Sequence, residues 1–596
     1  MDIINIKVSD NNHEATLLKT KAFLIITIVA IALLVPQILT KSIVLGSDAI
    51  FHFNRIYDTA QQIRTGNFNY FQSNYGFQQA GRIITPLYGP LMSYLLGTIL
   101  LLTGSWLKFQ VIINLLVLVI AGYGLFLLAK RTGAEQTFAL IAGILFMTSV
   151  SVTAWITKQH FTSVGLILIP YVLYYAIDFL EEDRPLRIWG LALSMALIVE
   201  THFLSALFAV VALVILFIIG LIIHKNKLAF FRQVAFAGTI ALLLTLNVWG
   251  SLLDVYHGNH LLSTWPYQNL DAGAMKLSFA EETETQLGLT LSILLIIQLI
   301  YVATHLKQVS RNNLIFSFIG GFFLLLSSKL MLWNFLGAAF PSLTTLMQYP
   351  SRIRGIAVVF LFTAIALSCS ENAVHYSKLR PILTGSLLLV ATFAAFNTYM
   401  NMTQLAQTWH SDQPISATNA IVKRKHLTAD QIRGAFRSAN LSKGLKVVPK
   451  STPDYLPTHT KVDPAHYLKM HPYALVSTNL IKNNGFDKFV LSDGTLKIKW
   501  YSKTTKQVTL PAVIYAHSNI TLNKHNVKAT KLTTTQIGNP IVQSKPGNNV
   551  ATINYHTSKT VSTLIWISLI LWPITLLVIL VVKTIKVVQN RHHLSL

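Results

Sequence analysis

Two adjacent stretches decide the architecture of this chain: the apolar AFLIITIVAIALLVPQILT at residues 22–40 and the polar GSDAIFHFNRIYDTAQQIRTGN at residues 46–67. The first is uncharged and about as long as a bilayer is thick. Lys19 and Lys21 precede it, and it lacks a small-residue cleavage site. We therefore predict an uncleaved first span that carries the chain outward from a cytoplasmic N-terminus at residues 1–21. The polar stretch then lies in a first external loop, residues 44–85.

The composition extends this pattern to the whole chain. Of 596 residues, 52% are hydrophobic and only 12% are charged, and the mean hydropathy is +0.51. Water-soluble proteins carry about 25% charged residues, which excludes a large soluble enzyme. The single cysteine, Cys369, excludes a disulfide framework. In a membrane chain, the net charge of +25 indicates positive cytoplasmic loops and attraction to anionic lipid or wall polymer, rather than a nucleic-acid partner.

About twelve spans follow from the apolar runs and from the Lys and Arg residues between them. Residues 86–104 are predicted to dip into the interface without crossing, because Lys130 and Arg131 then fall inside; a full span there is the alternative. The stretch 188–223 is too long for one helix, and Glu200, Thr201 and His202 interrupt it, which predicts two spans joined by an outside turn. The predicted spans are about 22–40, 108–129, 136–154, 163–180, two within 188–223, 233–252, one ending near 304, 313–335, 355–369, 381–399 and 562–583.

Residues 400–560 differ in character, with 18 Lys and 3 Arg against 6 Asp and no Glu. The alternating segments KFVLSD, LKIKWYS and QVTLPAVIYA predict β-strands there. The predicted fold is therefore a polytopic α-helical protein of the cell membrane. Its parts are a multi-span domain at 22–399, an extracytoplasmic basic domain of α/β or β-rich structure at 400–560, and a last span with a cytoplasmic tail at 561–596.

The first external loop carries the densest polar pattern. On a helix, Asp48, His52 and Arg55 share one face, at i, i+4 and i+7. The carboxylate suits a general base, the imidazole orients it or shares its proton, and the guanidinium suits a phosphate oxygen. The simpler interpretation is an amphipathic interface helix capped by Asp48.

Several cations fall on the predicted outer face, against the usual positive-inside distribution. An anionic ligand is one reason for them; contact with lipid headgroups or with a loop acid is the other. Glu200 and His202 are predicted to face the same cavity as the first loop, or else to pin the helix turn by a buried hydrogen bond. The candidate site residues are Asp48 and His52 for catalysis, Arg55, Arg352, Arg354 and Lys158 for a donor phosphate, and Glu200 and His202 in support, with no metal ligand assigned.

Five motifs in this order resemble bacterial membrane proteins of the YfhO type and the group called 6-pyruvoyl-tetrahydropterin-synthase-related membrane proteins: GSDAIFHFNRI at 46–56, TPLYGPL at 85–91, ETHFLSAL at 200–207, QYPSRIR at 348–354 and DYLP at 454–457. The resemblance covers most of the chain and implies a GT-C-like glycosyltransferase. In that class an acid of the first external loop is catalytic and the donor is a polyprenyl-phosphate sugar, so the acid here is Asp48. Ala49 follows it, so the paired-acid metal motif of the class is absent, and a divalent metal is left open as a cofactor.

The predicted function is transfer of a sugar from a polyprenyl-phosphate donor to an envelope acceptor, an anionic polymer or a glycolipid, on the outer face of the bilayer. One alternative is a transporter or flippase of lipid-linked saccharide. Another is a non-catalytic envelope-assembly protein. The predicted span interiors are nearly free of charge and no repeated halves are evident, which favours the enzyme over the transporter.

Overall fold

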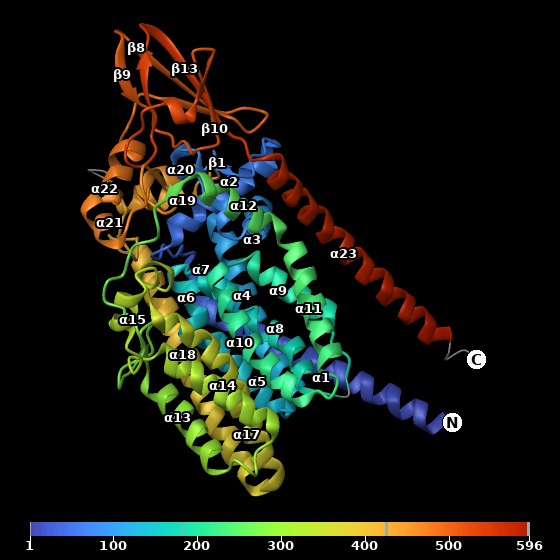
Figure 1. The fold of residues 1–596 in the computed structure, drawn as a ribbon. Coiled ribbons are helices and arrows are strands. Elements are labelled where there is room, and N and C mark those ends of the chain that lie inside the picture. Colours follow the sequence, from blue (N-terminus) through green and yellow to red (C-terminus); the bar gives the residue numbers. More distant parts are fainter. Residues whose placement is uncertain (1, 183, 423–426, 593–596) are drawn as a thin grey trace.

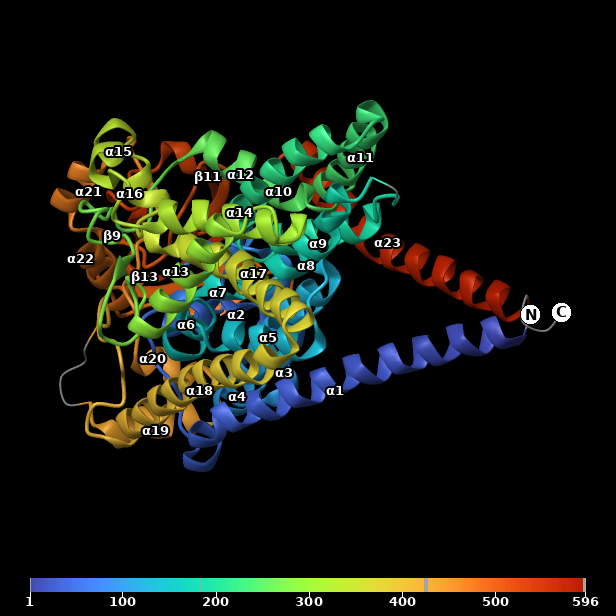
Figure 2. The same ribbon diagram turned by 90° about the horizontal axis from the view of Figure 1, so that it is seen from below.

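The computed structural model describes residues 2–182, 184–422 and 427–592 as a helical bundle with a β-sheet domain at one end (Figure 1). The remaining residues fall in the predicted cytoplasmic N-terminus, one predicted cytoplasmic loop, the basic segment and the C-terminal tail, and lie outside the described part of the chain. In both views the first turns of α1 (Asp2–Thr40) and the last turns of α23 (Lys559–His592) lie close together, away from the sheet domain (Figures 1 and 2).

The bundle helices follow the predicted apolar runs. The other long helices are α4 (Trp106–Thr132), α10 (Phe203–Ile223), α11 (Lys227–Leu244), α17 (Arg354–His375) and α18 (Arg380–His410). The shorter ones are α2 (Ala49–Thr65), α3 (Pro90–Thr103), α5 (Gln136–Thr148), α6 (Val150–Lys158), α7 (Phe161–Leu166), α8 (Ile169–Ala176), α9 (Ile188–Val199), α12 (Leu246–Gly258), α13 (Leu289–Thr304) and α14 (Arg311–Ser327). The interruption predicted within 188–223 is present at residues 200–202, between α9 and α10.

Within the described residues, eight helical segments are long and apolar enough to cross a membrane, and nine if α5 and α6, bent by 41°, form one span. The apolar helices α3, α9, α13 and α14 are only 10–17 residues long. These lengths and compositions are those of a multi-pass membrane protein. The count of twelve spans stays a prediction.

Two predicted spans have different limits in the structure. The span predicted at 233–252 is divided at Thr245, between α11 and α12, where the Thr245 backbone N–H donates to the Leu242 carbonyl (3.2 Å) and its hydroxyl donates to the Ala241 carbonyl (2.9 Å). The span predicted at 313–335 ends earlier, at Ser327, whose hydroxyl bonds back to the Leu324 carbonyl (2.7 Å). The chain then continues through the short helices α15 (Trp333–Ala339) and α16 (Leu343–Leu346).

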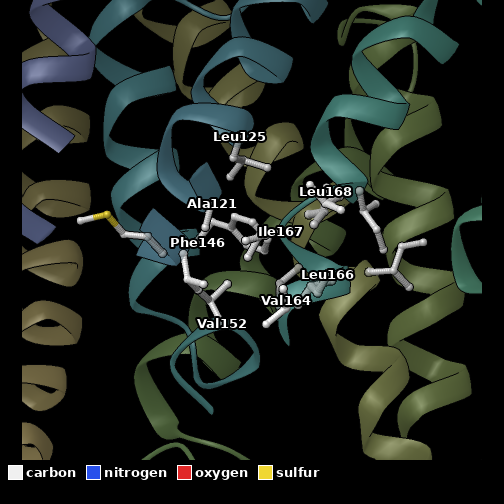
Figure 3. Packing of buried hydrophobic residues seen from close by; sticks show 14 of the residues in the cluster. Ala121, Leu125, Phe146, Val152, Val164, Leu166, Ile167 and Leu168 are labelled. Carbon is white, nitrogen blue, oxygen red and sulfur yellow. The ribbon is translucent and has the colours of Figure 1, made fainter. Parts of the chain in front are cut away.

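Helix α17 lies at the centre of the bundle, among α4, α5 and α14 (Figure 2). Within the stretch Pro350–His375 that contains it, an apolar window of 18 residues is wholly buried. Small residues let its neighbours approach, as in other membrane bundles: a Cβ on Gly355 would lie 2.8 Å from the Leu166 side chain. Figure 3 shows Leu166 within the apolar layer beside Val152, Val164 and Ile167.

Helix α3 packs along α2 and starts next to residues 200–201. The two helices touch at Gly97, where a Cβ would lie 2.3 Å from Thr59 Oγ1. Trp106, just beyond the end of α3, donates its indole N–H to the Leu441 carbonyl of the basic segment (3.1 Å). Both ends of α3 therefore lie near segments that the sequence places on the outer face, and the dip of residues 86–104 into the interface stays a prediction.

The basic segment folds as a mixed α/β domain. Its helices are α19 (Ala429–Arg437), α20 (Ser442–Val447), α21 (Pro464–Met470) and α22 (Pro472–Val476). A five-stranded antiparallel sheet has the order β11-β10-β13-β8-β7, and β9 pairs with β12. The strands are β7 (Asp487–Val490), β8 (Leu496–Ser502), β9 (Lys506–Thr509), β10 (Ser518–Leu522), β11 (His525–Lys528), β12 (Ile541–Ser544) and β13 (Gly547–Tyr555). The strands predicted at KFVLSD and LKIKWYS are present as β7 and β8, whereas the one at QVTLPAVIYA stops at Thr509, because Pro511 has no N–H for a ladder.

The remaining strands are two residues long and tie loops together. They are β1 (Gln72–Ser73) with β2 (Arg82–Ile83), β3 (His260–Leu261) with β6 (Pro457–Thr458), and β4 (Lys276–Leu277) with β5 (Gln286–Leu287). The β3–β6 pair joins the loop after α12 to the DYLP motif of the basic segment. This strand pair connects the basic segment to the bundle.

Candidate active site

A cavity of about 1830 Å³ lies at the end of the bundle that carries the sheet domain. The Asp, Glu, Lys and Arg side chains that line it come from five separate parts of the chain: residues 46–52, 157–163, 281–284, 348–354 and 450–455. Its apolar lining comes from bundle helices and includes Leu166, Ile169, Phe208, Leu252 and Leu405. A charged region against an apolar wall suits an amphipathic ligand.

Asp48 lies at the amino end of α2, where the main chain fixes its position. Its backbone N–H donates to the Lys158 carbonyl (3.0 Å). Gly46 approaches the same backbone so closely that a Cβ would lie 2.4 Å from Lys158 Cα. The Asp48 side chain is 44% exposed, and its carboxylate lies 3.9 Å from Lys450 Nζ and 4.0 Å from His160 Nε2. Such a carboxylate is placed to accept a proton from a bound hydroxyl.

The shared face predicted for Asp48, His52 and Arg55 is not formed as a whole. Arg55 is 1% exposed, donates to the Tyr88 carbonyl and to Ser93 Oγ (2.5 Å), and does not line the cavity. The predicted phosphate role of Arg55 is therefore wrong, because a buried guanidinium must spend its donors on the surrounding protein. His52 does line the cavity, and burial together with the charge of Arg55 lowers its pKa well below the usual range, so the ring is neutral.

Arg352 presents its charge to the cavity. Its guanidinium donates to the Met347 carbonyl (3.3 Å) and lies 5.4 Å from the centre of the Tyr349 ring. No carboxylate within the described part of the chain lies within 4.0 Å of it. Among the predicted phosphate-binding residues, Arg352 is thus the one that reaches the cavity without an acidic partner.

Arg354 and Lys158 also line the cavity, but each already has an acidic neighbour. Arg354 is 2% exposed, donates to the Thr283 carbonyl (2.8 Å) and lies 3.6 Å from Glu282. Lys158 pairs with Glu284 at 3.0 Å. Both cations therefore hold residues 282–284 at the cavity. For these two residues the structure matches the second explanation of the outer cations, which was contact with an acid of a loop.

Glu200 and His202 point to different places. His202 lines the cavity, and its Nδ1 accepts the Ser205 N–H (3.2 Å) at the start of α10. Glu200 is 1% exposed and does not line the cavity; its carboxylate accepts the Leu91 N–H (3.2 Å) at the start of α3. The prediction that both face one cavity is wrong for Glu200, because the amino end of α3 offers a buried N–H that needs an acceptor.

The basic segment closes the cavity with Lys450 and Asp454, two residues that sequence reasoning missed. Lys450 Nζ contacts the Ser47 carbonyl, next to Asp48. Arg82 of the first external loop donates to the Thr452 and Asp454 carbonyls, both at 2.7 Å, and so holds this segment in place. Burial raises the pKa of Asp454 to about 6, although the charge of Arg82 acts in the opposite direction.

The sequence contained a weak signal for Asp454. DYLP entered only as part of a family resemblance, yet it places an acid between Pro453 and Pro457 in a segment that is poor in acids. An acid between two prolines indicates a rigid loop that holds a polar side chain in place. No comparable signal pointed to Lys450, one of 18 lysines in its segment.

His160 and Glu284 are further cavity residues without an assigned role. His160 Nδ1 lies 2.6 Å from Glu284 Oε1, and its Nε2 lies 2.8 Å from Ser47 Oγ. Burial alone would raise the pKa of Glu284, but the His160 hydrogen bond and the charges of His160 and Lys158 lower it to about 2. The Glu284 carboxylate is therefore ionised. Among the described residues, no group of three His, Cys, Asp or Glu side chains is arranged to hold a metal ion.

No protein-family model matches this chain, and the comparison with curated proteins gave no match. Among solved structures, the apo form of the oligosaccharyltransferase of Archaeoglobus fulgidus matches with 13% sequence identity and a TM-score of 0.32. The match covers 76% of this chain and 64% of that one, so this chain spans less than two thirds of its length. At such identity and TM-score the likeness carries no argument about activity, which must rest on the cavity.

Proposed function

We propose that this protein is a GT-C-like membrane glycosyltransferase that moves a sugar from a polyprenyl-phosphate donor to a cell-envelope acceptor on the outer face. One observation carries the proposal: the cavity combines the carboxylate of Asp48, the guanidinium of Arg352, which has no acidic partner among the described residues, and an apolar helical wall. A polyprenyl-phosphate sugar has matching parts, an apolar tail, an anionic phosphate and a polar sugar. Because Arg354 and Lys158 pair with acids, Arg352 is left to meet the phosphate, and Lys450, whose Nζ lies 3.9 Å from the Asp48 carboxylate, adds a second positive charge beside it.

In this mechanism Asp48 is the general base. It takes the proton of the acceptor hydroxyl, whose oxygen attacks the anomeric carbon as the bond to the phosphate breaks, with inversion. Arg352 and Lys450 stabilise the charge left on the lipid phosphate. His52 and His202 form the neutral wall beside the sugar. The reaction needs no nucleotide, in keeping with a sequence that has no Walker phosphate loop.

The acceptor binds at the side of the cavity that the basic segment, residues 400–560, forms. Residues 400–560 carry 21 cations against 6 acids, and part of this segment lines the cavity. An anionic envelope polymer or glycolipid is the partner that such a surface attracts. On this proposal the segment lies outside the cell, and the bundle end with Arg131 and Asp178 faces the cytoplasm.

Mass spectrometry of cell-envelope polymers tests the proposal. Cells without the protein are compared with cells that regain it, and we expect one hexose-sized mass difference on a polymer or glycolipid. A flippase would instead change the amount of lipid-linked donor on each leaflet and move it with its sugar still attached. Identical polymers in both strains, with unchanged donor distribution, would leave only the assembly role.

Arg352→Ala is expected to raise the KM for the lipid-phosphate donor by about tenfold or more, because a charge-assisted phosphate contact is lost. The KM for the acceptor should change much less. Initial rates with purified protein and a short synthetic polyprenyl-phosphate sugar measure both constants. Arg352→Lys should recover part of the effect, and equal changes in the two constants would argue against a phosphate contact.

Gly46→Ala is expected to lower the transfer rate by about 10²-fold, because the new Cβ forces the first loop away from Lys158 and displaces Asp48. Gly238→Ala is the matched control, since a Cβ there meets nothing within 4 Å. Rates and melting temperatures are measured for both variants. A Gly46→Ala protein as active as the control would show that the position of Asp48 does not limit transfer.

A further inference from the structure

Ser47, His160 and Glu284 form a hydrogen-bonded line inside the cavity. His160 lies in the middle, with Nδ1 2.6 Å from Glu284 Oε1 and Nε2 2.8 Å from Ser47 Oγ. An ionised carboxylate only accepts hydrogen bonds, so the proton between His160 and Glu284 belongs to Nδ1. The lone pair of Nε2 then faces the Ser47 hydroxyl. A nucleophile, a base and an acid that orients the base stand in this relation in hydrolases that use an activated serine.

The surrounding chain holds each member of this line. The second oxygen of Glu284 accepts from Lys158 Nζ (3.0 Å). The backbone N–H of His160 donates to the Ala154 carbonyl (3.2 Å). The preceding residue, Gln159, has a left-handed backbone conformation. Ser47 precedes the residue that is anchored to the Lys158 carbonyl. Its Oγ lies 3.4 Å from that carbonyl, farther than from His160, so the imidazole is its closer partner.

Donors for an oxyanion are also present next to Ser47. The Ser47 N–H makes no hydrogen bond within the described part of the chain. Lys450 Nζ contacts the carbonyl of the same residue. Either group can stabilise negative charge that develops beside Ser47 Oγ.

We propose that Ser47 is the nucleophile of a second activity of this cavity, acyl transfer from or hydrolysis of a carboxylic ester, with His160 as base and Glu284 as its positioning residue. The ester is carried by a lipid or a glycan, because the apolar wall offers a place for an acyl or prenyl chain beside the polar region. This activity is independent of the proposed sugar transfer.

The atoms balance without a co-reactant beyond water or an alcohol. Ser47 Oγ bonds to the ester carbonyl carbon while its proton passes to His160 Nε2. The bond from that carbon to the leaving alcohol breaks, and the alcohol leaves with the Nε2 proton. Water or an acceptor hydroxyl then attacks the acyl-serine, passes its proton through Nε2 back to Ser47 Oγ, and departs as a carboxylic acid or an acylated product.

A second serine and histidine, Ser205 and His202, lie close together but lack the features of Ser47, His160 and Glu284. Ser205 Oγ also lies near a histidine nitrogen, His202 Nδ1 at 2.9 Å, but it donates to the Thr162 carbonyl (3.1 Å) and is 1% exposed. The same nitrogen of His202 accepts the Ser205 N–H (3.2 Å). Ser205 lines the cavity but is almost fully buried, its hydroxyl is engaged by the Thr162 carbonyl, and no acid orients His202 among the described residues.

A fluorophosphonate that carries a fluorophore tests the proposal on the purified full-length protein. The probe bonds covalently to a serine whose hydroxyl is deprotonated by a neighbouring base. We expect a time-dependent adduct on the peptide that contains Ser47, identified by mass spectrometry, and none in Ser47→Ala. His160→Gln should slow labelling by about 10²-fold or more and Glu284→Gln by about tenfold or more.

Ser416→Ala is the matched control, because Ser416 also lines the cavity but donates to the Leu45 carbonyl (2.7 Å) and has no histidine beside it. Its labelling should equal that of the unmodified protein. Melting temperatures and gel filtration identify any variant that misfolds. Absence of an adduct on Ser47, or labelling of folded His160→Gln as fast as the unmodified protein, overturns the proposal. The assay contains no sugar donor, so its outcome is separate from that of the transfer assay.

Discussion

Asp48→Asn is expected to lower sugar transfer by about 10³-fold, because an amide cannot take the proton of the acceptor hydroxyl. The shape of the side chain is preserved, and no helix cap is lost, because the Asp48 side chain makes no capping hydrogen bond to α2. The backbone contact with Lys158 is unaffected, so the first loop should keep its position. Initial rates of the purified variant with a synthetic polyprenyl-phosphate sugar measure the effect, and the melting temperature tests the fold.

Asp430→Asn provides the matched control for this experiment. Asp430 is 90% exposed, lies in α19 of the basic segment and pairs only with Arg433 among the described residues. The same chemical change there should leave both rate and melting temperature as they are. Full activity of Asp48→Asn would remove the general-base role, and with it the main reason to regard the cavity as a glycosyl-transfer site.

Asp178→Ala is expected to destabilise the protein by about 3 kcal/mol, the usual scale for removal of one partner from a buried ion pair. Asp178 has a 2% exposed side chain and accepts from Arg131 Nη2 (2.8 Å) and from Arg187 Nε (2.8 Å). Both guanidiniums would lose this partner at the end of the bundle away from the cavity. Arg131 would keep Glu181 (2.7 Å), which limits the loss.

Thermal unfolding in mild detergent measures this effect. Asp430→Ala, which breaks an exposed pair, should shift the melting temperature little, because solvent screens such pairs. Asp178→Asn should lie between Asp178→Ala and the unmodified protein, since its amide oxygen still accepts a hydrogen bond. An unchanged melting temperature for Asp178→Ala would mean that the cluster does not hold the helices together.

The helical part of the fold could be predicted because it follows from local properties. An apolar run of bilayer length forms a helix that satisfies its own backbone, and residues 22–40, 108–129 and 355–369 all lie within helices. The break at residues 200–202 was evident from three polar residues in an apolar stretch. The helix ends at Thr245 and Ser327 were missed because both residues lie in apolar stretches, where hydropathy does not mark the end of a helix.

The candidate site was predicted less well. Asp48, Arg352 and His202 were identified from polar residues in unexpected places, and all three line the cavity. Arg55 and Glu200 were also charged residues in unexpected places, but they do not line the cavity. Each instead forms a hydrogen bond with a buried backbone group near the start of α3. A sequence pattern shows that a charge must be compensated, but it does not identify the partner.

The sequence by itself determined that the chain has the apolar helices of a multi-pass membrane protein and that its basic segment contains strands, since these depend on neighbours a few residues apart. Only the tertiary structure decided that Lys450 and Asp454 close over Asp48, that Arg352 keeps its charge free while Arg354 and Lys158 do not, and that His160 joins Ser47 to Glu284. These contacts join segments that are far apart in the sequence, from 72 residues for Arg354 and Glu282 to 126 for Lys158 and Glu284 and more for Lys450. Which of them form depends on how the helices pack around the buried α17, and that packing fixes the loops at the cavity.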